Sequence, residues 1–149
     1  MTAVRPATRD DLDEVSALFD AYRVFYGYPS DAVAARSYLD QHLRSGTSTI
    51  LVALSDTGVA VGFTQLYPSF CSLELAPILV LYDLYVSPDA RGAGVATALL
   101  DAARALGVAT GAARLELSTA HTNLTAQRLY ESHGWKPDTE YRHYELTLG

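Results

Sequence analysis

Asp83 is the residue of this sequence that most directly indicates chemistry. It lies within the almost wholly apolar run Ile78–Val86, where a carboxylate is costly unless it is paired or used. A carboxylate in such a position can act as a general base, which accepts a proton from a reacting group. Glu116 is a second candidate for this role, although its alternation with two leucines equally predicts a solvent-facing position. The competing interpretation of Asp83 places it near the surface or bonded to a tyrosine hydroxyl.

A glycine-rich turn follows the apolar run and opens a predicted helix. Its residues are Arg91, Gly92, Ala93, Gly94, Val95 and Ala96. Such a turn directs several free backbone N–H groups at one point, and the helix dipole adds roughly half a positive charge there, which suits a pyrophosphate. Glycines at a strand-to-helix junction also serve simply to relieve steric strain. A Rossmann dinucleotide site is excluded, because the turn follows several antiparallel elements and Glu116 lies inside its strand rather than at the end.

Aromatic residues gather where the first predicted helix ends. Tyr22, Phe25, Tyr26 and Tyr28 occur there, and Tyr67 ends a predicted strand. Aromatic faces and phenol oxygens suit an aliphatic ammonium through cation–π attraction and hydrogen bonding. These tyrosines are therefore candidates for the wall of a pocket that binds a cationic substrate. Core packing is an equal alternative for any one of them.

Two helices are predicted in the first third of the chain. Apolar residues recur at three- and four-residue spacing from Leu12 to about Phe25, after an N-cap arrangement at Thr8 that resembles a capping box. A second helix is predicted over residues 31–44, with Ser30 as its cap.

The remaining pattern predicts an α+β fold with a mixed sheet. A short strand at residues 3–5 opens the chain, and a β-hairpin over residues 49–54 and 59–67 is followed by a loop over 68–77. The later elements are strand 78–86, helix 95–106, strand 114–118, helix 124–133 and strand 141–148. The strand–helix–strand unit in the second half predicts one parallel pair.

Composition narrows the class of protein. A chain of 149 residues with 49% hydrophobic content predicts one domain over residues 1–149. The net charge of −6 opposes binding to nucleic acid or anionic lipid, and no apolar run is long enough to span a membrane. The one cysteine and the four histidines have no metal-ligand spacing, so no metal is predicted, and a cytoplasmic location is the expectation.

Two motifs resemble those of the GNAT superfamily of N-acetyltransferases. The first has Arg or Gln, two residues, Gly, one residue, and Gly or Ala, which Arg91, Gly94 and Ala96 match. The second has an Asn followed seven positions later by a Tyr, then Gly and an aromatic residue. Asn123, Tyr130, Gly134 and Trp135 match this second motif.

The resemblance implies a fold and a cofactor site. The family sheet is mixed and mostly antiparallel, with about six to seven strands, about four helices and a splayed parallel pair that binds CoA. By this resemblance, backbone groups of Leu84, Tyr85 and Val86 pair with the pantetheine arm of acetyl-CoA, and the turn Arg91–Ala96 holds its pyrophosphate. Asn123 helps to hold the cofactor, and Tyr130 meets its sulfur.

The resemblance also implies a reaction. Tyr130 is the predicted acid that protonates the departing thiolate, with Asp83 or Glu116 as base. The segment Tyr82–Val86 resembles polyamine-type acetyltransferases, so the predicted acceptor is a primary amine of a small molecule, acetylated directly in a ternary complex. The alternatives are an enzyme that acetylates protein lysines or N-termini, or an acetyl-CoA sensor without turnover. Family members frequently pair, so a homodimer is a further expectation.

Overall fold

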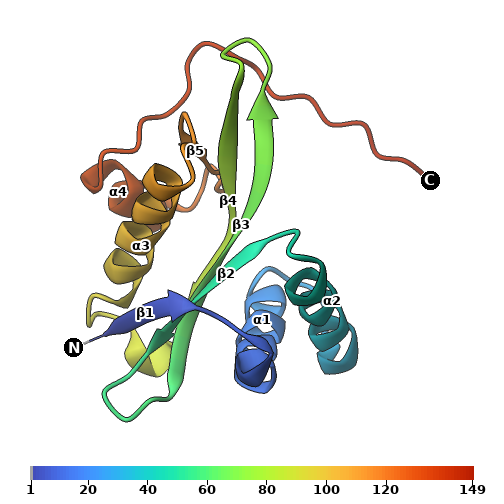
Figure 1. Ribbon diagram of the computed structural model, residues 1–149, viewed down its shortest axis with the longest axis vertical. Coiled ribbons are helices and arrows are strands. Elements are labelled where there is room, and N and C mark those ends of the chain that lie inside the picture. The colour runs from blue at the N-terminus through green and yellow to red at the C-terminus, as the bar shows by residue number, and fades with distance from the viewer. Residues whose placement is uncertain (1) are drawn as a thin grey trace. The chain divides into compact units, whose positions relative to one another are not determined.

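The computed structural model describes residues 2–149 and divides them into two compact units. The first ends at Leu117 and carries the sheet, and the second is Ser118–Gly149 (Figure 1).

The first unit is built on a five-stranded sheet. In spatial order its strands are β1 (Ala3–Pro6), β2 (Thr49–Leu54), β3 (Ala60–Cys71), β4 (Ala76–Val86) and β5 (Leu115–Glu116). Neighbouring strands are antiparallel except β4 and β5, which are parallel. The predicted α+β class and mixed sheet are confirmed. The predicted number of six to seven strands is wrong, because five are found in residues 2–149.

Helices cover both faces of this sheet. Figure 1 shows α1 (Leu12–Phe25) and α2 (Ala32–Ser45) on one side and α3 (Val95–Ala109) on the other. Two 3₁₀ turns, η1 (Arg9–Asp11) and η2 (Pro88–Ala90), precede α1 and α3. The helix α4 (Leu124–Ser132) of the second unit completes the predicted four.

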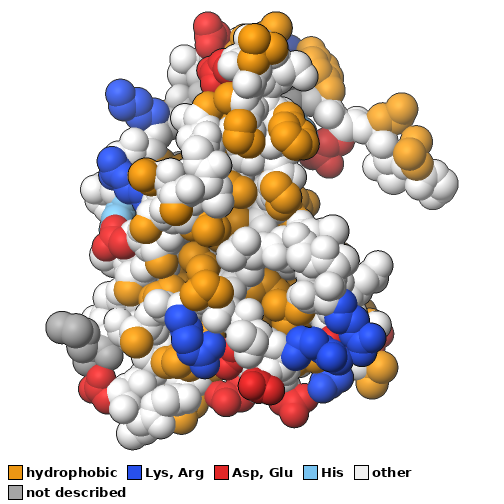
Figure 2. All heavy atoms as spheres, in the orientation of Figure 1, with side chains coloured by type: hydrophobic (Ala, Val, Ile, Leu, Met, Phe, Trp, Pro, Cys, Tyr) orange, Lys and Arg blue, Asp and Glu red, His pale blue; other side chains and the backbone are white. Residues whose placement is uncertain are grey.

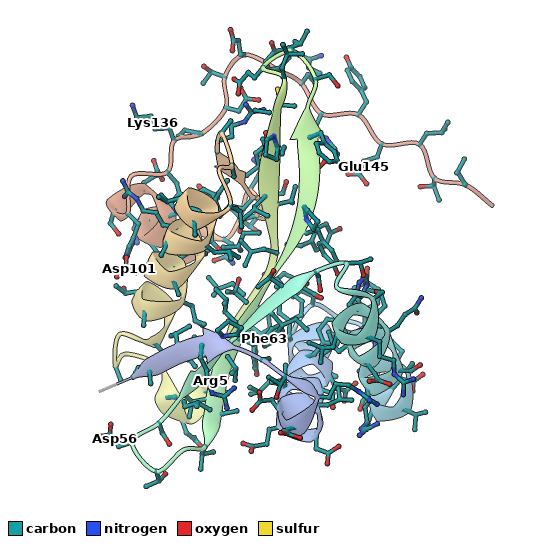
Figure 3. All side chains as sticks on the ribbon, in the orientation of Figure 1. Arg5, Asp56, Phe63, Asp101, Lys136 and Glu145 are labelled. Atoms are coloured by element: carbon teal, nitrogen blue, oxygen red, sulfur yellow. The ribbon has the colours of Figure 1, made fainter. Side chains whose placement is uncertain are left out.

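The sequence pattern of α1 places its apolar stripe in the core. Val15 and Phe19 are buried against Leu39 of α2 and Phe63 of β3, and Figure 3 labels Phe63 at the centre of the sheet. The Phe19 and Phe63 rings meet edge to face, with centroids 6.1 Å apart. Thr8 forms the predicted capping box with η1. The helix therefore presents its next turn, which contains Tyr22, to the same region of the sheet.

The β3–β4 hairpin is longer than the sequence predicts. Residues 68–77 were expected to form a loop because they contain two prolines, yet Pro68 pairs with Leu79 and Pro77 with Phe70. Pro68 is tolerated because β3 has already passed its last pairing with β2, at Leu66, so the missing N–H is not needed on that side. The hairpin tip exposes Phe70 and other apolar side chains, which are visible at the top of Figure 2.

A β-bulge interrupts the pairing of β3 with β4. Gln65 pairs with Asp83 and Leu66 with Leu81, so Tyr82 is the extra residue on β4. A bulge twists the strand and redirects the side chains next to it. Here it lies immediately before Asp83.

The arginines of η1 and α2 form ion pairs on the outer surface. Figure 2 shows a cluster of basic side chains over these helices with acidic ones beside them. Arg9 and Arg44 both contact Asp40 at 3.0 Å, and Arg36 contacts Asp13 at 2.9 Å. Exposed pairs of this kind contribute about 1 kcal/mol or less each.

The start of α2 differs from the prediction. Its N-cap is Asp31, whose Oδ1 accepts from the Ala34 amide at 3.0 Å, and not Ser30. The Ser30 hydroxyl instead donates to Oδ2 of Asp20 at 2.6 Å, and the Asp31 amide donates to Oδ1 of Asp20 at 2.8 Å. Asp20 therefore ties the end of α1 to the start of α2.

The second unit consists of α4 and an extended C-terminal segment. The predicted strand at residues 141–148 is wrong, because residues 133–149 form neither helix nor strand. Its alternating pattern is suitable for a strand, but a strand also needs a partner whose backbone groups are free. Tyr141, Tyr144, Leu146 and Leu148 are all exposed.

Candidate active site

The first unit contains a cavity of about 380 Å³ between α1, α2 and the sheet. It brings together all five residues predicted to contact the acceptor, namely Tyr22, Tyr26, Tyr28, Tyr67 and Asp83. Phe25, the other aromatic residue of the predicted cluster, does not line it.

Four further residues complete the wall, and sequence reasoning missed them. They are Phe19, Arg23, Tyr38 and Tyr82. Phe19 and Arg23 stand three or four residues from Tyr22 and Tyr26 on α1, so helical spacing could have found them. Tyr38 comes from α2, and no local signal connects that helix to the cavity.

Asp83 is buried in the cavity wall, with 5% of its surface exposed. Nε2 of Gln65 donates to its carboxylate at 2.9 Å, and the Ser48 hydroxyl holds the same amide by donating to its Oε1 at 2.8 Å. Burial raises the pKa of Asp83 above its usual value, because desolvation outweighs the hydrogen bonds from Gln65 and Tyr22. A carboxyl group with a raised pKa is suited to accept a proton near neutral pH.

Three tyrosine hydroxyls of the cavity are held by hydrogen bonds. Those of Tyr38 and Tyr67 are 2.6 Å apart, and the Tyr22 hydroxyl donates to the Tyr82 carbonyl at 3.3 Å. Burial raises the pKa of Tyr67, and the hydrogen bond to Tyr38 and the charge of Asp83 raise it further. The wall near Asp83 therefore offers neutral hydroxyls and aromatic faces.

Glu116, the second predicted base, does not line this cavity. Its carboxylate accepts from Nε of Arg114 at 2.7 Å, and Arg114 also pairs with Glu74 at 3.1 Å. Glu116 is exposed, as its alternation with two leucines predicts.

The glycine-rich turn has the geometry that an anion site requires. Gly92 and Gly94 both have φ of +80°, which side chains rarely allow, and a Cβ at either would meet nothing within 4 Å. The helix α3 begins at Val95 without a side-chain cap, and the first amide bonded inside it is that of Ala98. The Arg91 amide donates to the Pro88 carbonyl at 3.3 Å, whereas within residues 2–149 the amides of residues 92–97 remain available to a ligand.

Arg91 is fixed where β4 meets this turn. Its Nε donates to the Val86 carbonyl at 3.0 Å, and its guanidinium lies 5.5 Å from the ring centroid of Tyr85 and 5.9 Å from that of Phe25. Arg91, which is predicted to bind the pyrophosphate, therefore contacts Tyr85 and Val86, which are predicted to pair with the pantetheine arm.

The strand β4 has a free edge next to this turn. It pairs with β5 only at Leu79 and Val80, and in the described chain no strand covers that edge from Leu81 to Val86. Backbone N–H and C=O groups on such an edge require partners, and an amide-rich chain can supply them. Leu84, Tyr85 and Val86 thus fit the pantetheine arm of CoA, and the turn fits its pyrophosphate.

Asn123 and Tyr130 belong to the second unit. Asn123 is the N-cap of α4, and its Oδ1 accepts from the Ala126 amide at 3.2 Å. The Tyr130 ring lies 6.2 Å from that of Trp135, and the Trp135 amide donates to the Tyr130 carbonyl at 3.1 Å. The second motif therefore forms a short capped helix with a defined C-terminal turn.

The sequence comparison establishes the family. Residues 15–135 match the model of the Acetyltransferase (GNAT) family, and the chain belongs to it. The protein is therefore an N-acetyltransferase of a family that uses acetyl-CoA.

Individual relatives agree with this assignment. The chain is 40% identical over 145 residues to the uncharacterized N-acetyltransferase YhfO of Bacillus subtilis, covering 97% of each chain. It is also 40% identical to a probable acetyltransferase of known crystal structure, with a TM-score of 0.94 and coverage of 99% and 98%. At 21% identity, AAC(6')-Iy, solved with the bisubstrate analogue CoA-S-monomethyl-acetylneamine, shares the fold with a TM-score of 0.82 and coverage of 99% of each chain.

The described residues contain neither a candidate membrane span nor a candidate metal site. Among the described residues, no helix is long and apolar enough to cross a membrane. Among these residues there is also no group of three or more His, Cys, Asp or Glu side chains that could hold a metal ion.

The turn gives a first testable prediction. Gly94→Ala should weaken CoA binding by roughly tenfold, because a Cβ at φ of +80° costs about 1–2 kcal/mol and occupies the open space where the pyrophosphate is expected. The dissociation constant of CoA, measured by calorimetry, checks this.

Gly111→Ala is the matched control, since Gly111 also has positive φ and open space but lies beyond the other end of α3. Equal loss of CoA affinity in both variants would show that the effect is general strain and not contact with the cofactor.

Proposed function

We propose that this protein transfers the acetyl group of acetyl-CoA directly to a primary amine of a small molecule, within a ternary complex. The observation that carries the proposal is the buried Asp83 in the wall of an aromatic cavity, one residue before the strand segment that fits pantetheine. The acceptor cavity and the cofactor edge thus share β4.

The cavity favours a small, cationic acceptor. Its volume of about 380 Å³ is near the lower end of the range for small-molecule sites, which is roughly 300–1,000 Å³. Tyrosine faces attract an ammonium group, and the Asp83 carboxylate adds a charge of opposite sign. AAC(6')-Iy was solved with CoA linked to an acetylated neamine, which supports the same combination of co-substrate and amine in this fold.

Two residues move protons in this reaction. Asp83 accepts a proton from the bound ammonium, and the neutral amine then attacks the thioester carbonyl, forming the C–N bond. As the C–S bond breaks, Tyr130 donates its phenolic proton to the CoA thiolate, whose basicity is comparable. The Tyr130 phenolate then takes the second proton of the newly acylated nitrogen, and Asp83 releases its proton to solvent, so the products are the N-acetylated amine, CoA thiol and one proton.

Release of CoA thiol from acetyl-CoA tests the proposal. The panel contains polyamines, amino acids, aminoglycosides and lysine peptides, each at several concentrations. We expect amine-dependent, saturable release with at least one small amine and a mass increase of one acetyl group on that amine.

Two results would contradict the proposal. Release stimulated only by lysine peptides would identify a protein acetyltransferase instead. Tight binding of acetyl-CoA without release by any amine would identify a sensor.

A further inference from the structure

Arg23 has an unsatisfied group in the cavity wall. It lines the same cavity as Asp83, and its Nη1 is buried without a hydrogen-bond partner in residues 2–149. Its guanidinium lies over the Tyr28 ring, 5.3 Å from the centroid. A buried donor that finds no acceptor destabilises the protein, and more so when it is charged, so a ligand that supplies the acceptor would remove this penalty.

Neither of the neighbouring carboxylates forms an ion pair with Arg23 in the described chain. Asp20, one turn earlier, accepts from Ser30 and Asp31, as shown above. These hydrogen bonds, together with a smaller effect of the Arg23 charge, lower the pKa of Asp20. The Asp83 carboxylate is bonded by Gln65. Arg23 thus differs from Arg9 of η1 and from Arg36 and Arg44 of α2, which are paired.

The cavity therefore presents two opposite charges that are not bonded to each other. A diamine would bring its second ammonium toward the guanidinium and be repelled. A carboxylate would instead match the planar N–H fork of Arg23. An acceptor with both an amine and a carboxylate satisfies Asp83 and Arg23 together.

We propose that the acceptor is an amine that also carries a carboxylate, which Arg23 binds while Asp83 faces the amine. This inference rests on the proposed function and narrows it. It departs from the polyamine-type acceptor that the segment Tyr82–Val86 indicates.

Matched acceptor pairs provide the test. The value of kcat/KM is compared for lysine and cadaverine, ornithine and putrescine, and tyrosine and tyramine, each pair differing by one carboxylate. We expect the amino acid to be preferred, and Arg23→Gln to reduce the preference by roughly 10- to 100-fold, mainly through KM. Arg36→Gln is the control, because Arg36 is an exposed arginine of α2 outside the cavity, and it should leave the preference unchanged.

A second comparison needs no variant. Lysine amide replaces lysine in the wild-type assay, which removes the carboxylate charge and keeps the length of the molecule. We expect kcat/KM to fall by a similar factor.

The outcomes separate this inference from the proposed function. Equal or better activity with cadaverine, putrescine or lysine amide overturns the role of Arg23 and leaves the small-amine acetyltransferase standing. An absence of CoA release with every amine overturns the proposed function itself.

Discussion

Replacing Asp83 by Asn lowers kcat/KM for amine acetylation by about 10²- to 10⁴-fold, the range typical of losing a general base. The amide has nearly the shape of the carboxylate, and its oxygen can still accept from Gln65, but it cannot take the proton of the ammonium. Thiol release at saturating acetyl-CoA measures this loss. Asp101→Asn is the matched control: Asp101, labelled in Figure 3, is an exposed carboxylate on α3, and its replacement should leave the rate unchanged.

The pH dependence of the wild-type enzyme is a second test of Asp83 as the general base. Because burial raises the pKa of Asp83, kcat/KM should fall with decreasing pH along a limb that lies above 3.8, the ordinary value. Asp83→Asn should remove that limb from the residual activity. An unchanged profile in the variant would show that another group is the base.

The same pKa shift predicts how stability responds. A carboxyl group whose pKa is raised on folding binds more protons in the folded state, so its contribution to stability falls as pH rises through the window between the unfolded and folded values. The ionised form of Asp83 therefore contributes less to stability than the protonated form. We expect Asp83→Asn to keep or raise Tm, which separates loss of activity from loss of structure.

Replacing Tyr130 by Phe lowers kcat by about 10²- to 10⁴-fold, the contribution typical of a general acid. The phenol, with a pKa of about 10, is the proposed proton donor to the thiolate, and Phe keeps the ring that packs near Trp135. The measurement is kcat with saturating amine and acetyl-CoA.

Tyr144→Phe is the matched control for this variant. Tyr144 is 79% exposed in the C-terminal segment, so removal of its hydroxyl should have no effect on kcat. If Tyr130→Phe behaved like Tyr144→Phe, the thiolate would have to be protonated by another group, and the role taken from the family motif would be wrong.

Features determined by neighbouring residues could be predicted from the sequence. The spacing of Val15 and Phe19, the Thr8 capping box and the positive φ of Gly92 and Gly94 each depend on a few adjacent positions. For this reason helix α1, the glycine-rich turn and the family motifs can be predicted without the structure.

Strand pairing could not be predicted in the same way. The β3–β4 hairpin continues through Pro68 because β2 has already left that edge of β3, and the alternating segment 141–148 has no partner strand in the described chain. Whether a segment becomes a strand depends on which backbone lies beside it, and a single segment does not contain that information.

The chemistry of the site was also decided by tertiary structure. The sequence alone identified Asp83, but only packing buries it, which raises its pKa, and brings it the opposing hydrogen bonds of Gln65 and Tyr22, which are distant in the chain. The same packing leaves Arg23 without an acceptor and brings Tyr38 of α2 to the cavity. Residue type and local spacing thus determine which groups are present, whereas desolvation and hydrogen-bond partners, which set their reactivity, arise only when distant segments pack together.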